Sequence, residues 1–219
     1  MSNLTYTTAV FDLDGTLLDT LEDLYLATNA ALRRHHLPPR TRDEIRLFVG
    51  NGVEMLVRRA VPATTEEDIT RAVLADFKAV YAAIWEEHTT PYPGVLDLLS
   101  RLRAAGVRVA VVSNKFDEAT KSLCRRYFGE LVEVAVGERA GVRKKPAPDT
   151  VMEALRDLGE TAEGAVYVGD SDVDIETARG AGMPCISVTW GLRDEAFLVA
   201  HGATAFAHTA EELWEMLTR

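Results

Sequence analysis

Short apolar runs that alternate with amphipathic stretches of helical length are the feature that most constrains the fold of this 219-residue chain. The apolar runs lie at 8–13, 107–112, 132–136, 165–168 and 185–188. The amphipathic stretches lie at 95–105, 117–127 and 148–158, with another at Ala210, Leu213, Trp214 and Leu217. Strands that alternate with helices of this length form βαβ units. We therefore expect an α/β core with a Rossmann-like, doubly wound parallel sheet.

The segment between the first two apolar runs breaks this alternation, because it has helical patterns and no strand pattern. One helical stripe contains Leu21, Leu24, Thr28 and Leu32, and a second contains Ile69, Val73, Phe77, Val80 and Ile84. The sequence Pro91-Tyr92-Pro93-Gly94 marks the return to the core. We expect an all-helical cap domain of residues 19–89, inserted into a core domain of residues 1–18 and 90–219.

The composition excludes several classes of function. Asp and Glu outnumber Lys and Arg by 34 to 24, and the net charge of −10 argues against attraction to nucleic acid or anionic lipid. No apolar run approaches the roughly 18 residues that span a bilayer, and the first ten residues lack a signal-peptide pattern. The two cysteines, Cys124 and Cys185, form no CxxC motif. We expect a cytoplasmic monomer or homodimer with no membrane or nucleic-acid partner.

Two carboxylates follow the first apolar run. Asp12 and Asp14 are two residues apart in DLDGT, so their side chains project to the same side of an extended chain. Ligands of open parallel sheets bind outside the carboxyl ends of the strands, which is where this pair should lie. Asp14-Gly15 taken alone is more typical of a turn than of a binding site. The functional interpretation therefore depends on what the other strand ends carry.

The later apolar runs also end in polar residues. Ser113 and Asn114 follow one run in VVSNK, Lys145 lies in the basic loop KKPAPD, and Asp170 and Asp174 follow another run in GDSDVD. Carboxylates gathered this densely repel one another unless a cation neutralises them. Oxygen ligands without sulfur or imidazole favour a hard ion such as Mg²⁺.

In chain order, DLDGT, VVSNK, KKPAPD and GDSDVD resemble the four motifs of the haloacid dehalogenase superfamily. The helical insertion between the first two motifs resembles the cap domain of that family. The run from Gly169 to Gly182 and the segment 188–193 (VTWGLR) are similar to the phosphoglycolate phosphatase branch. The resemblance covers nearly the whole chain.

The resemblance implies a mechanism with two aspartates. Asp12 would be the nucleophile that forms an aspartyl-phosphate intermediate. Asp14 would protonate the leaving alcohol and then activate the hydrolytic water. One Mg²⁺ would be held by Asp12, the backbone carbonyl of Asp14 and Asp170.

The resemblance also assigns supporting roles. Ser113 would donate to a phosphoryl oxygen, and Lys145 would place a cation against the nucleophile and the transferring group. Asp174 would support the waters of the metal or Lys145. Thr16 and Asn114 would fix loop geometry, and Asn114 is a further candidate for binding substrate.

The function that the sequence favours is a Mg²⁺-dependent phosphatase acting on a small phosphorylated metabolite, with 2-phosphoglycolate as the leading substrate. Arg46, in a basic part of the cap, is the candidate for binding a substrate carboxylate. The alternatives are a hexose-phosphate mutase of the beta-phosphoglucomutase type, or a pyrophosphatase or nucleotidase of the same superfamily. A non-catalytic member is disfavoured, because every matched position keeps the residue that the chemistry requires.

Overall fold

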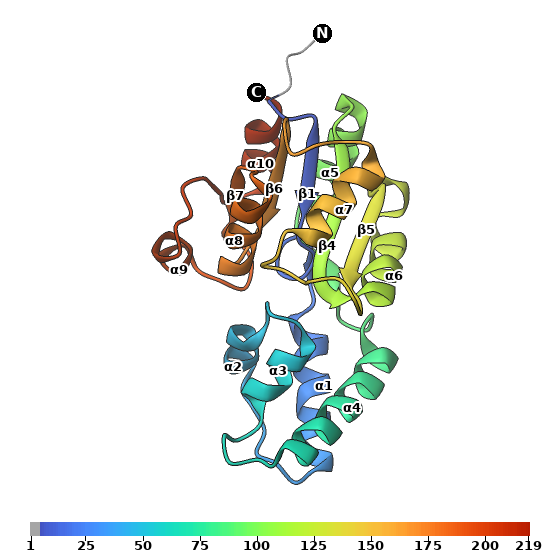
Figure 1. Cartoon of the computed structure of the whole chain (residues 1–219), viewed down its shortest axis with the longest axis vertical. Coiled ribbons are helices and arrows are strands. Elements are labelled where there is room, and N and C mark those ends of the chain that lie inside the picture. The colour runs from blue at the N-terminus through green and yellow to red at the C-terminus, as the bar shows by residue number, and fades with distance from the viewer. Residues whose placement is uncertain (1–4) are drawn as a thin grey trace. The chain divides into compact units, whose positions relative to one another are not determined.

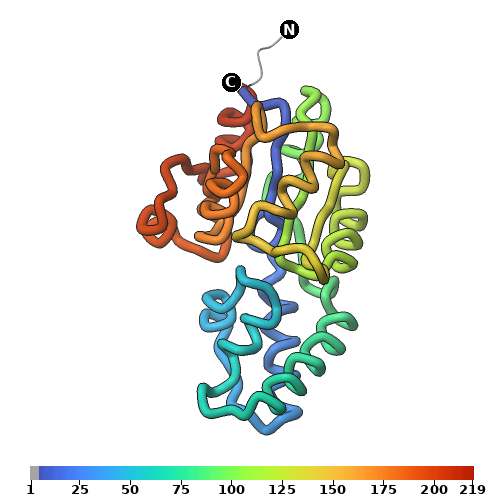
Figure 2. Tube along the Cα trace, viewed as in Figure 1, coloured from blue at the N-terminus to red at the C-terminus, as the bar shows by residue number. Residues whose placement is uncertain are grey.

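The computed structural model describes residues 5–219, which divide into two compact units. The first unit, the core, contains the described residues up to Leu18 and Pro91–Arg219, and the second, the cap, is Asp19–Thr90. The chain therefore leaves the core once and returns once, as the tube in Figure 2 shows. The two connecting segments, β2 (Leu18–Asp19) and β3 (Thr90–Pro91), pair as a small two-stranded sheet.

The core is built on a six-stranded sheet in the order β5-β4-β1-β6-β7-β8, with every adjacent pair parallel (Figure 1). The strands are β1 (Thr8–Phe11), β4 (Arg108–Phe116), β5 (Val134–Glu138), β6 (Ala165–Gly169), β7 (Cys185–Val188) and β8 (Phe206–Ala207). The chain passes from β1 to β4 on one side and later enters β6 on the other side. The strand order reverses at β1, so its carboxyl end opens the crevice where such sheets bind ligands.

Helices cover both faces of this sheet, which explains why its central strands are apolar throughout. The helices α7 (Asp149–Leu158) and α8 (Asp172–Ala181) pack together on one face. On the other face, α5 (Val95–Ala105) packs against α10 (Ala210–Thr218), and α6 (Asp117–Tyr127) covers β4 and β5. Shorter elements are η1 (Gly129–Leu131) and α9 (Glu195–Ala200).

The cap is made of four helices, namely α1 (Leu21–Arg34), α2 (Arg42–Phe48), α3 (Val53–Ala60) and α4 (Glu67–Ile84). Their apolar faces meet around Phe77, which is fully buried and stacks on Tyr81 with ring centroids 5.5 Å apart. Thr41 and Glu44 form a reciprocal capping box at the start of α2. Among the helices of residues 5–219, none has both the length and the apolar character needed to cross a membrane.

The fold class predicted from the sequence is confirmed, and the differences lie at element boundaries. The strand expected to end at residue 112 continues to Phe116, although its pairing with β5 is irregular between Val112 and Phe116. The polar side chains at 113–115 mimic a loop in the sequence, but Thr120 Oγ1 and Asn114 Nδ2 anchor this segment through hydrogen bonds. The two-residue strand β8 and the short helix α9 were not predicted, because elements of that length carry no periodicity.

A buried carboxylate in the first helix of the cap binds the segment where the cap ends. Asp23, in the first turn of α1, is fully buried and accepts hydrogen bonds from the segment where the cap chain ends. The donors are the backbone N of His88 (3.0 Å), the backbone N of Thr89 (2.9 Å) and Thr89 Oγ1 (2.8 Å). His88 Nδ1 lies 2.9 Å from the same carboxylate. Asp23 therefore binds the last residues of the cap to its first helix.

We expect Asp23→Ala to lower the free energy of unfolding by about 2–4 kcal/mol, because buried donors at residues 88 and 89 would lose their acceptor. Urea titration followed by circular dichroism measures the change. Glu22→Ala is the matched control, since Glu22 is the neighbouring acid of α1 and pairs with Arg42 at the surface. Equally small shifts in both variants would contradict the role of Asp23.

Candidate active site

The first two candidate carboxylates lie on the loop that follows β1. The backbone N of Asp12 donates to Val168 O over 2.9 Å, so Asp12 lies in line with the end of β6. Gly15 turns the chain after Asp14 with a φ of +88°, and a Cβ at this position would overlap the carboxylate of Asp170. Glycine is therefore required here both for the turn and for the close approach of the third carboxylate.

Lys145 joins two of the carboxylates in the interior of the core. Its side chain is nearly fully buried, and Nζ lies 2.8 Å from Asp12 Oδ1 and 2.8 Å from Asp174 Oδ1. The same ammonium donates to the hydroxyl of Tyr167 over 2.9 Å. Although burial alone would lower the pKa of Lys145, the charges of Asp12 and Asp174 hold it well above its usual value. Lys145 therefore stays charged beside Asp12.

Asp174 uses both of its oxygens within the protein. Oδ1 faces Lys145, while Oδ2 accepts from the backbone N of Asp170 (3.2 Å), the backbone N of Ser171 (3.1 Å) and Ser171 Oγ (2.6 Å). This carboxylate sits at the amino end of α8, where the helix dipole favours negative charge. The geometry fits the supporting role expected of Asp174, because it holds Lys145 and the Asp170 backbone at once.

The loop after β7 closes over Asp170, which is 1% exposed. The backbone N of Leu192 donates to Asp170 Oδ2 over 2.6 Å, and a Cβ on Gly191 would overlap the same carboxylate. Burial holds the pKa of Asp170 well above its usual value, and the charges of Asp174 and Asp12 add to that rise. The carboxylate is thus held in an environment that favours a nearby cation.

Asp14 is paired with a lysine of the second motif. Lys115 Nζ lies 2.8 Å from Asp14 Oδ1, and the lysine side chain is 2% exposed against 13% for Asp14. The lysine backbone is fixed as well, because its N donates to Ser113 Oγ and its carbonyl accepts from Thr120 Oγ1. Lys115 therefore fixes the position of Asp14, the predicted acid and base, which is the more exposed of the two side chains.

The remaining polar candidates of the core are also buried. Ser113, at 3% exposure, accepts a hydrogen bond from the backbone N of Lys115. Asn114 Nδ2 donates to the backbone carbonyl of Lys145 over 3.0 Å and so holds the loop that carries the lysine. The carbonyl of Thr16 accepts from Trp190 Nε1, whereas its buried hydroxyl has no hydrogen-bond partner within residues 5–219. Asn114 thus has the loop-fixing geometry expected of it, whereas Thr16 contributes a backbone carbonyl that any residue would supply, and its predicted role stays a prediction.

The carboxylates fit a divalent cation. One oxygen each of Asp12, Asp170 and Asp174 lies within 4.8 Å of the other two, and all three residues are buried. Together with Asp14 they are four carboxylates, against the cations of Lys115, Lys145 and Arg193, so the group keeps a net negative charge. A bound cation would offset this charge, and an all-oxygen donor set suits a hard divalent ion.

Arg46 belongs to the cap, in the last turn of α2. Its Nε lies 3.9 Å from Asp43 Oδ1, and its side chain is partly exposed. It is not among the residues that the core brings together around Asp12, and its predicted contact with substrate stays a prediction.

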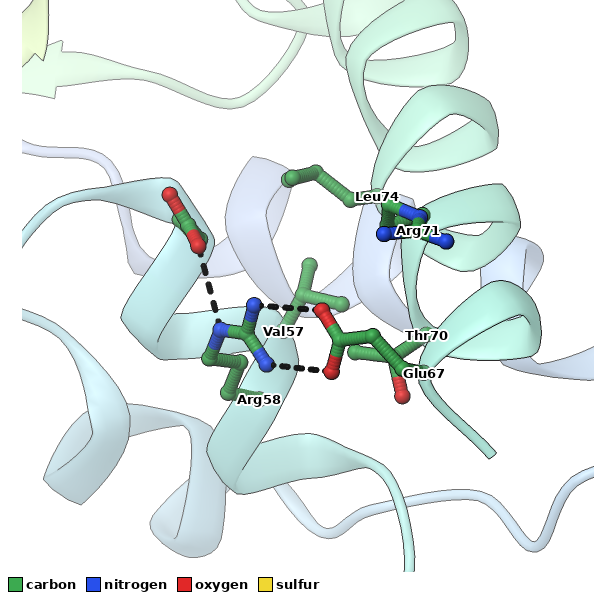
Figure 3. Close-up of a pocket in the computed structure, with 7 residues that line it drawn as sticks. Val57, Arg58, Glu67, Thr70, Arg71 and Leu74 are labelled. Carbon is green, nitrogen blue, oxygen red and sulfur yellow. Dashed lines mark hydrogen bonds and ion pairs between the residues drawn. The ribbon is translucent and has the colours of Figure 1, made fainter. Parts of the chain in front are cut away.

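A surface pocket of about 360 Å³ lies between α3 and α4 of the cap (Figure 3). Arg58 crosses it and donates to both carboxylate oxygens of Glu67, at 2.7 and 2.9 Å, and to Glu54 at 3.1 Å. Arg71, also in the lining, pairs with Asp68. The cations of this pocket are committed to carboxylates of the cap, so the pocket is no candidate for binding an anionic substrate.

Sequence reasoning missed three residues around the site. Lys115 lies in the motif VVSNK, yet nothing in the sequence indicates that it pairs with Asp14. Tyr167 follows the apolar pattern of a core strand, and only its hydroxyl distinguishes it from the neighbouring valines. Arg193 is 7% exposed, lies 5.5 Å from the Phe197 ring and contributes a positive charge near Asp170. Its position in the VTWGLR segment was the one available signal.

Comparison with known proteins decides the family. The model of the haloacid dehalogenase-like hydrolases matches residues 9–188, which includes all four motifs and the helical insertion. The chain belongs to the haloacid dehalogenase-like hydrolases. This finding confirms the resemblance stated from the sequence and the expectation of a hydrolytic enzyme.

Several relatives of this chain carry the name phosphoglycolate phosphatase. A phosphoglycolate phosphatase of Pseudomonas putida is 35% identical over 83% of this chain and 69% of its own length. One from Caulobacter vibrioides is 34% identical over 89% of this chain and 84% of its own length. Among solved structures, a provisionally named phosphoglycolate phosphatase of Lactobacillus delbrueckii subsp. bulgaricus is 38% identical, with a TM-score of 0.92 over 100% of this chain and 99% of its own. The predicted branch is therefore confirmed.

Metal-free protein should lose stability as the pH rises from about 4 to 7. Burial raises the pKa of Asp12 to about 7 against the opposing charge of Lys145, so the folded state binds a proton in this range that the unfolded state has released. The free energy of unfolding should fall by up to about 1.4 kcal/mol per pH unit for this group.

Urea titrations in EDTA from pH 4.5 to 8 measure this slope, and Asp12→Asn is the control because it has no proton to lose. The difference in unfolding free energy between the two proteins should change steadily through the window. A constant difference would show that Asp12 has an ordinary pKa.

Proposed function

We propose that this chain is a Mg²⁺-dependent phosphatase that hydrolyses 2-phosphoglycolate to glycolate and phosphate. The observation that carries the proposal is the buried cluster in which Lys145 joins Asp12 to Asp174, with Asp170 beside them. A carboxylate nucleophile, a fixed cation and an all-oxygen metal site are the groups that phosphoryl transfer through an aspartyl phosphate requires. The substrate is supported by relatives that carry the name phosphoglycolate phosphatase at 34–35% identity.

In the first half-reaction a carboxylate oxygen of Asp12 attacks phosphorus. The new bond joins Asp12 to the phosphoryl group, and the bond between phosphorus and the glycolate oxygen breaks. Asp14 donates its proton to that oxygen, so that glycolate leaves as the alcohol. Lys145 stays charged beside Asp12 and stabilises negative charge on the transferring group.

In the second half-reaction Asp14, now ionised, accepts a proton from water. The water oxygen attacks phosphorus, the bond to Asp12 breaks, and phosphate leaves with Asp12 restored as a carboxylate. Lys115 holds Asp14 in one place through both steps, because the lysine side chain is buried and its backbone is anchored by Ser113. Asp14 therefore returns to the same position after each proton transfer.

The metal would be held by Asp12, the backbone carbonyl of Asp14 and Asp170. When bound, Mg²⁺ supplies the positive charge that lets an anionic nucleophile meet a phosphate dianion. The residues of the chain contribute the rest: Asp174 holds the Asp170 backbone, and Leu192 fixes the Asp170 side chain.

The decisive experiment is a phosphate-release assay on a panel of phosphate esters with purified protein. Turnover of 2-phosphoglycolate should need Mg²⁺, stop with EDTA and return when Mg²⁺ is restored. Asp12→Asn should lower kcat by about four orders of magnitude, since an amide cannot attack phosphorus. Metal-independent turnover, or a variant within a few-fold of wild type, would refute the site. Isomerised hexose phosphate without phosphate release would indicate the mutase instead.

Arg46→Ala should raise KM for 2-phosphoglycolate at least about tenfold and leave KM for p-nitrophenyl phosphate nearly unchanged, because a bidentate arginine pairs with a carboxylate and not with a neutral ring. Steady-state kinetics on both substrates test this. Arg42→Ala is the matched control from the same helix, since Arg42 pairs with Glu22. Equal effects on the two substrates would remove Arg46 from substrate recognition.

A further inference from the structure

Tyr167 lies in the middle of the buried strand β6 and carries a polar group that the fold itself does not need. The residue is fully buried and its ring packs in the core cluster that includes Val10, Val112 and Ala178. Its neighbours in the strand, Val166 and Val168, are aliphatic. A phenylalanine ring would fill the same space, so the hydroxyl must be explained by what it contacts. A buried hydroxyl without partners costs free energy.

The partners of this hydroxyl belong to the active site. Tyr167 Oη accepts from Lys145 Nζ over 2.9 Å and lies 3.1 Å from Asp174 Oδ1 and 3.5 Å from Val112 O, either of which accepts its proton. Burial and the neighbouring carboxylates keep the pKa of Tyr167 well above its usual value, so it stays neutral. It therefore acts on Lys145 as a neutral acceptor.

The three protons of the lysine ammonium point to three acceptors. Asp12 and Asp174 lie at 2.8 Å each, and Tyr167 at 2.9 Å. Three acceptors fix the orientation of the ammonium as well as its position. A neutral third acceptor does so without adding a third negative charge, which would weaken the positive field at the phosphoryl group.

Lys145 needs such an anchor because it comes from the connection between β5 and α7, outside the sheet. Asn114 holds its backbone carbonyl, but the side chain must still be aimed at Asp12. The ring of Tyr167 is immobilised by close packing in the centre of the sheet, so its hydroxyl is a fixed point for the flexible lysine chain.

We propose that Tyr167 is a positioning residue, which holds the Lys145 ammonium against the nucleophile Asp12. The proposal rests on the proposed function, since it deepens the account of the same site. Tyr167 contacts neither substrate nor metal in this role and acts through the lysine. Its effect should therefore fall on the chemical step and not on substrate binding.

Tyr167→Phe keeps the ring and removes the hydroxyl. We expect kcat to fall about tenfold on both 2-phosphoglycolate and p-nitrophenyl phosphate, the loss expected for one hydrogen bond to a charged group. KM should change less than about twofold and Tm should stay close to that of wild type, because the packing is preserved. Tyr81→Phe, a second buried tyrosine that lies in the cap, is the control and should leave kcat unchanged. Unchanged kcat in Tyr167→Phe, or a loss that follows Tm or KM, would overturn the proposal.

Two further measurements separate this inference from the assignment of function. The wild-type assay alone decides whether 2-phosphoglycolate is the substrate, whereas the ratio of variant to wild type on p-nitrophenyl phosphate tests Tyr167 on any phosphatase. A ¹⁵N correlation spectrum of lysine ammonium groups needs no turnover: Lys145 should give a slowly exchanging signal that broadens in Tyr167→Phe. The same signal in both proteins would overturn the role of Tyr167. If the phenylalanine variant does not fold, Tyr167→Met, which also lacks the hydroxyl, carries the same expectations for kcat and for the lysine signal, but not for Tm, because it removes the ring.

Discussion

The contact between the Lys145 ammonium and the carboxylates of Asp12 and Asp174 is the interaction on which the rest of the active site depends. Carboxylates this close and this deeply buried are unfavourable as a group, because each loses water and repels the others. The lysine offsets part of that cost and also links the first strand of the core to helix α8. Removing its charge would leave Asp12 and Asp174 facing each other without a cation.

The parallel sheet brings these residues together because each lies at or just after the carboxyl end of a strand. Asp12 follows β1, Ser113 and Lys115 lie near the end of β4, and Asp170 follows β6, so neighbouring strands deliver all of them to one edge. Contacts between separate segments hold some of these residues, as the Leu192 N–H holds Asp170 and Lys145 holds Asp12. Others are held within their own segment, as Lys115 is by Ser113 and Asp174 by Ser171. Both kinds of contact fix the candidate site.

The sequence predicted what depends on local pattern and missed what depends on packing. Asp12 and Asp14 could be proposed as site residues because their spacing and their place after an apolar run are local features. A helical insertion could be proposed because its stripes persist for several turns. The partners of these residues could not be found. The pairing of Lys115 with Asp14 joins two strands about a hundred residues apart, and Tyr167 follows the same apolar pattern as any core aromatic residue. The end of β4 differs from the prediction because the polar residues 113–115 lie inside an extended strand, which the sequence pattern cannot distinguish from a loop.

The core carries the groups proposed for catalysis, so the choice among phosphate esters is a question for the cap. In the proposed mechanism the core groups act on the phosphoryl group and on the oxygen that leaves it, so they would suit any phosphate ester equally. The cap sequence is locally basic, and most of its arginines serve its own fold: Arg34 pairs with Asp76, Arg40 with Glu44, Arg42 with Glu22, Arg58 with Glu54 and Glu67, and Arg59 donates to Asn51 and Phe48 O. Arg46 also contacts a carboxylate of its own helix, with Nε 3.9 Å from Asp43 Oδ1. An arginine already paired within the cap must give up that contact before it can bind a substrate carboxylate. The positive charge of the cap sequence is thus largely balanced inside the cap, and that charge by itself does not identify the substrate.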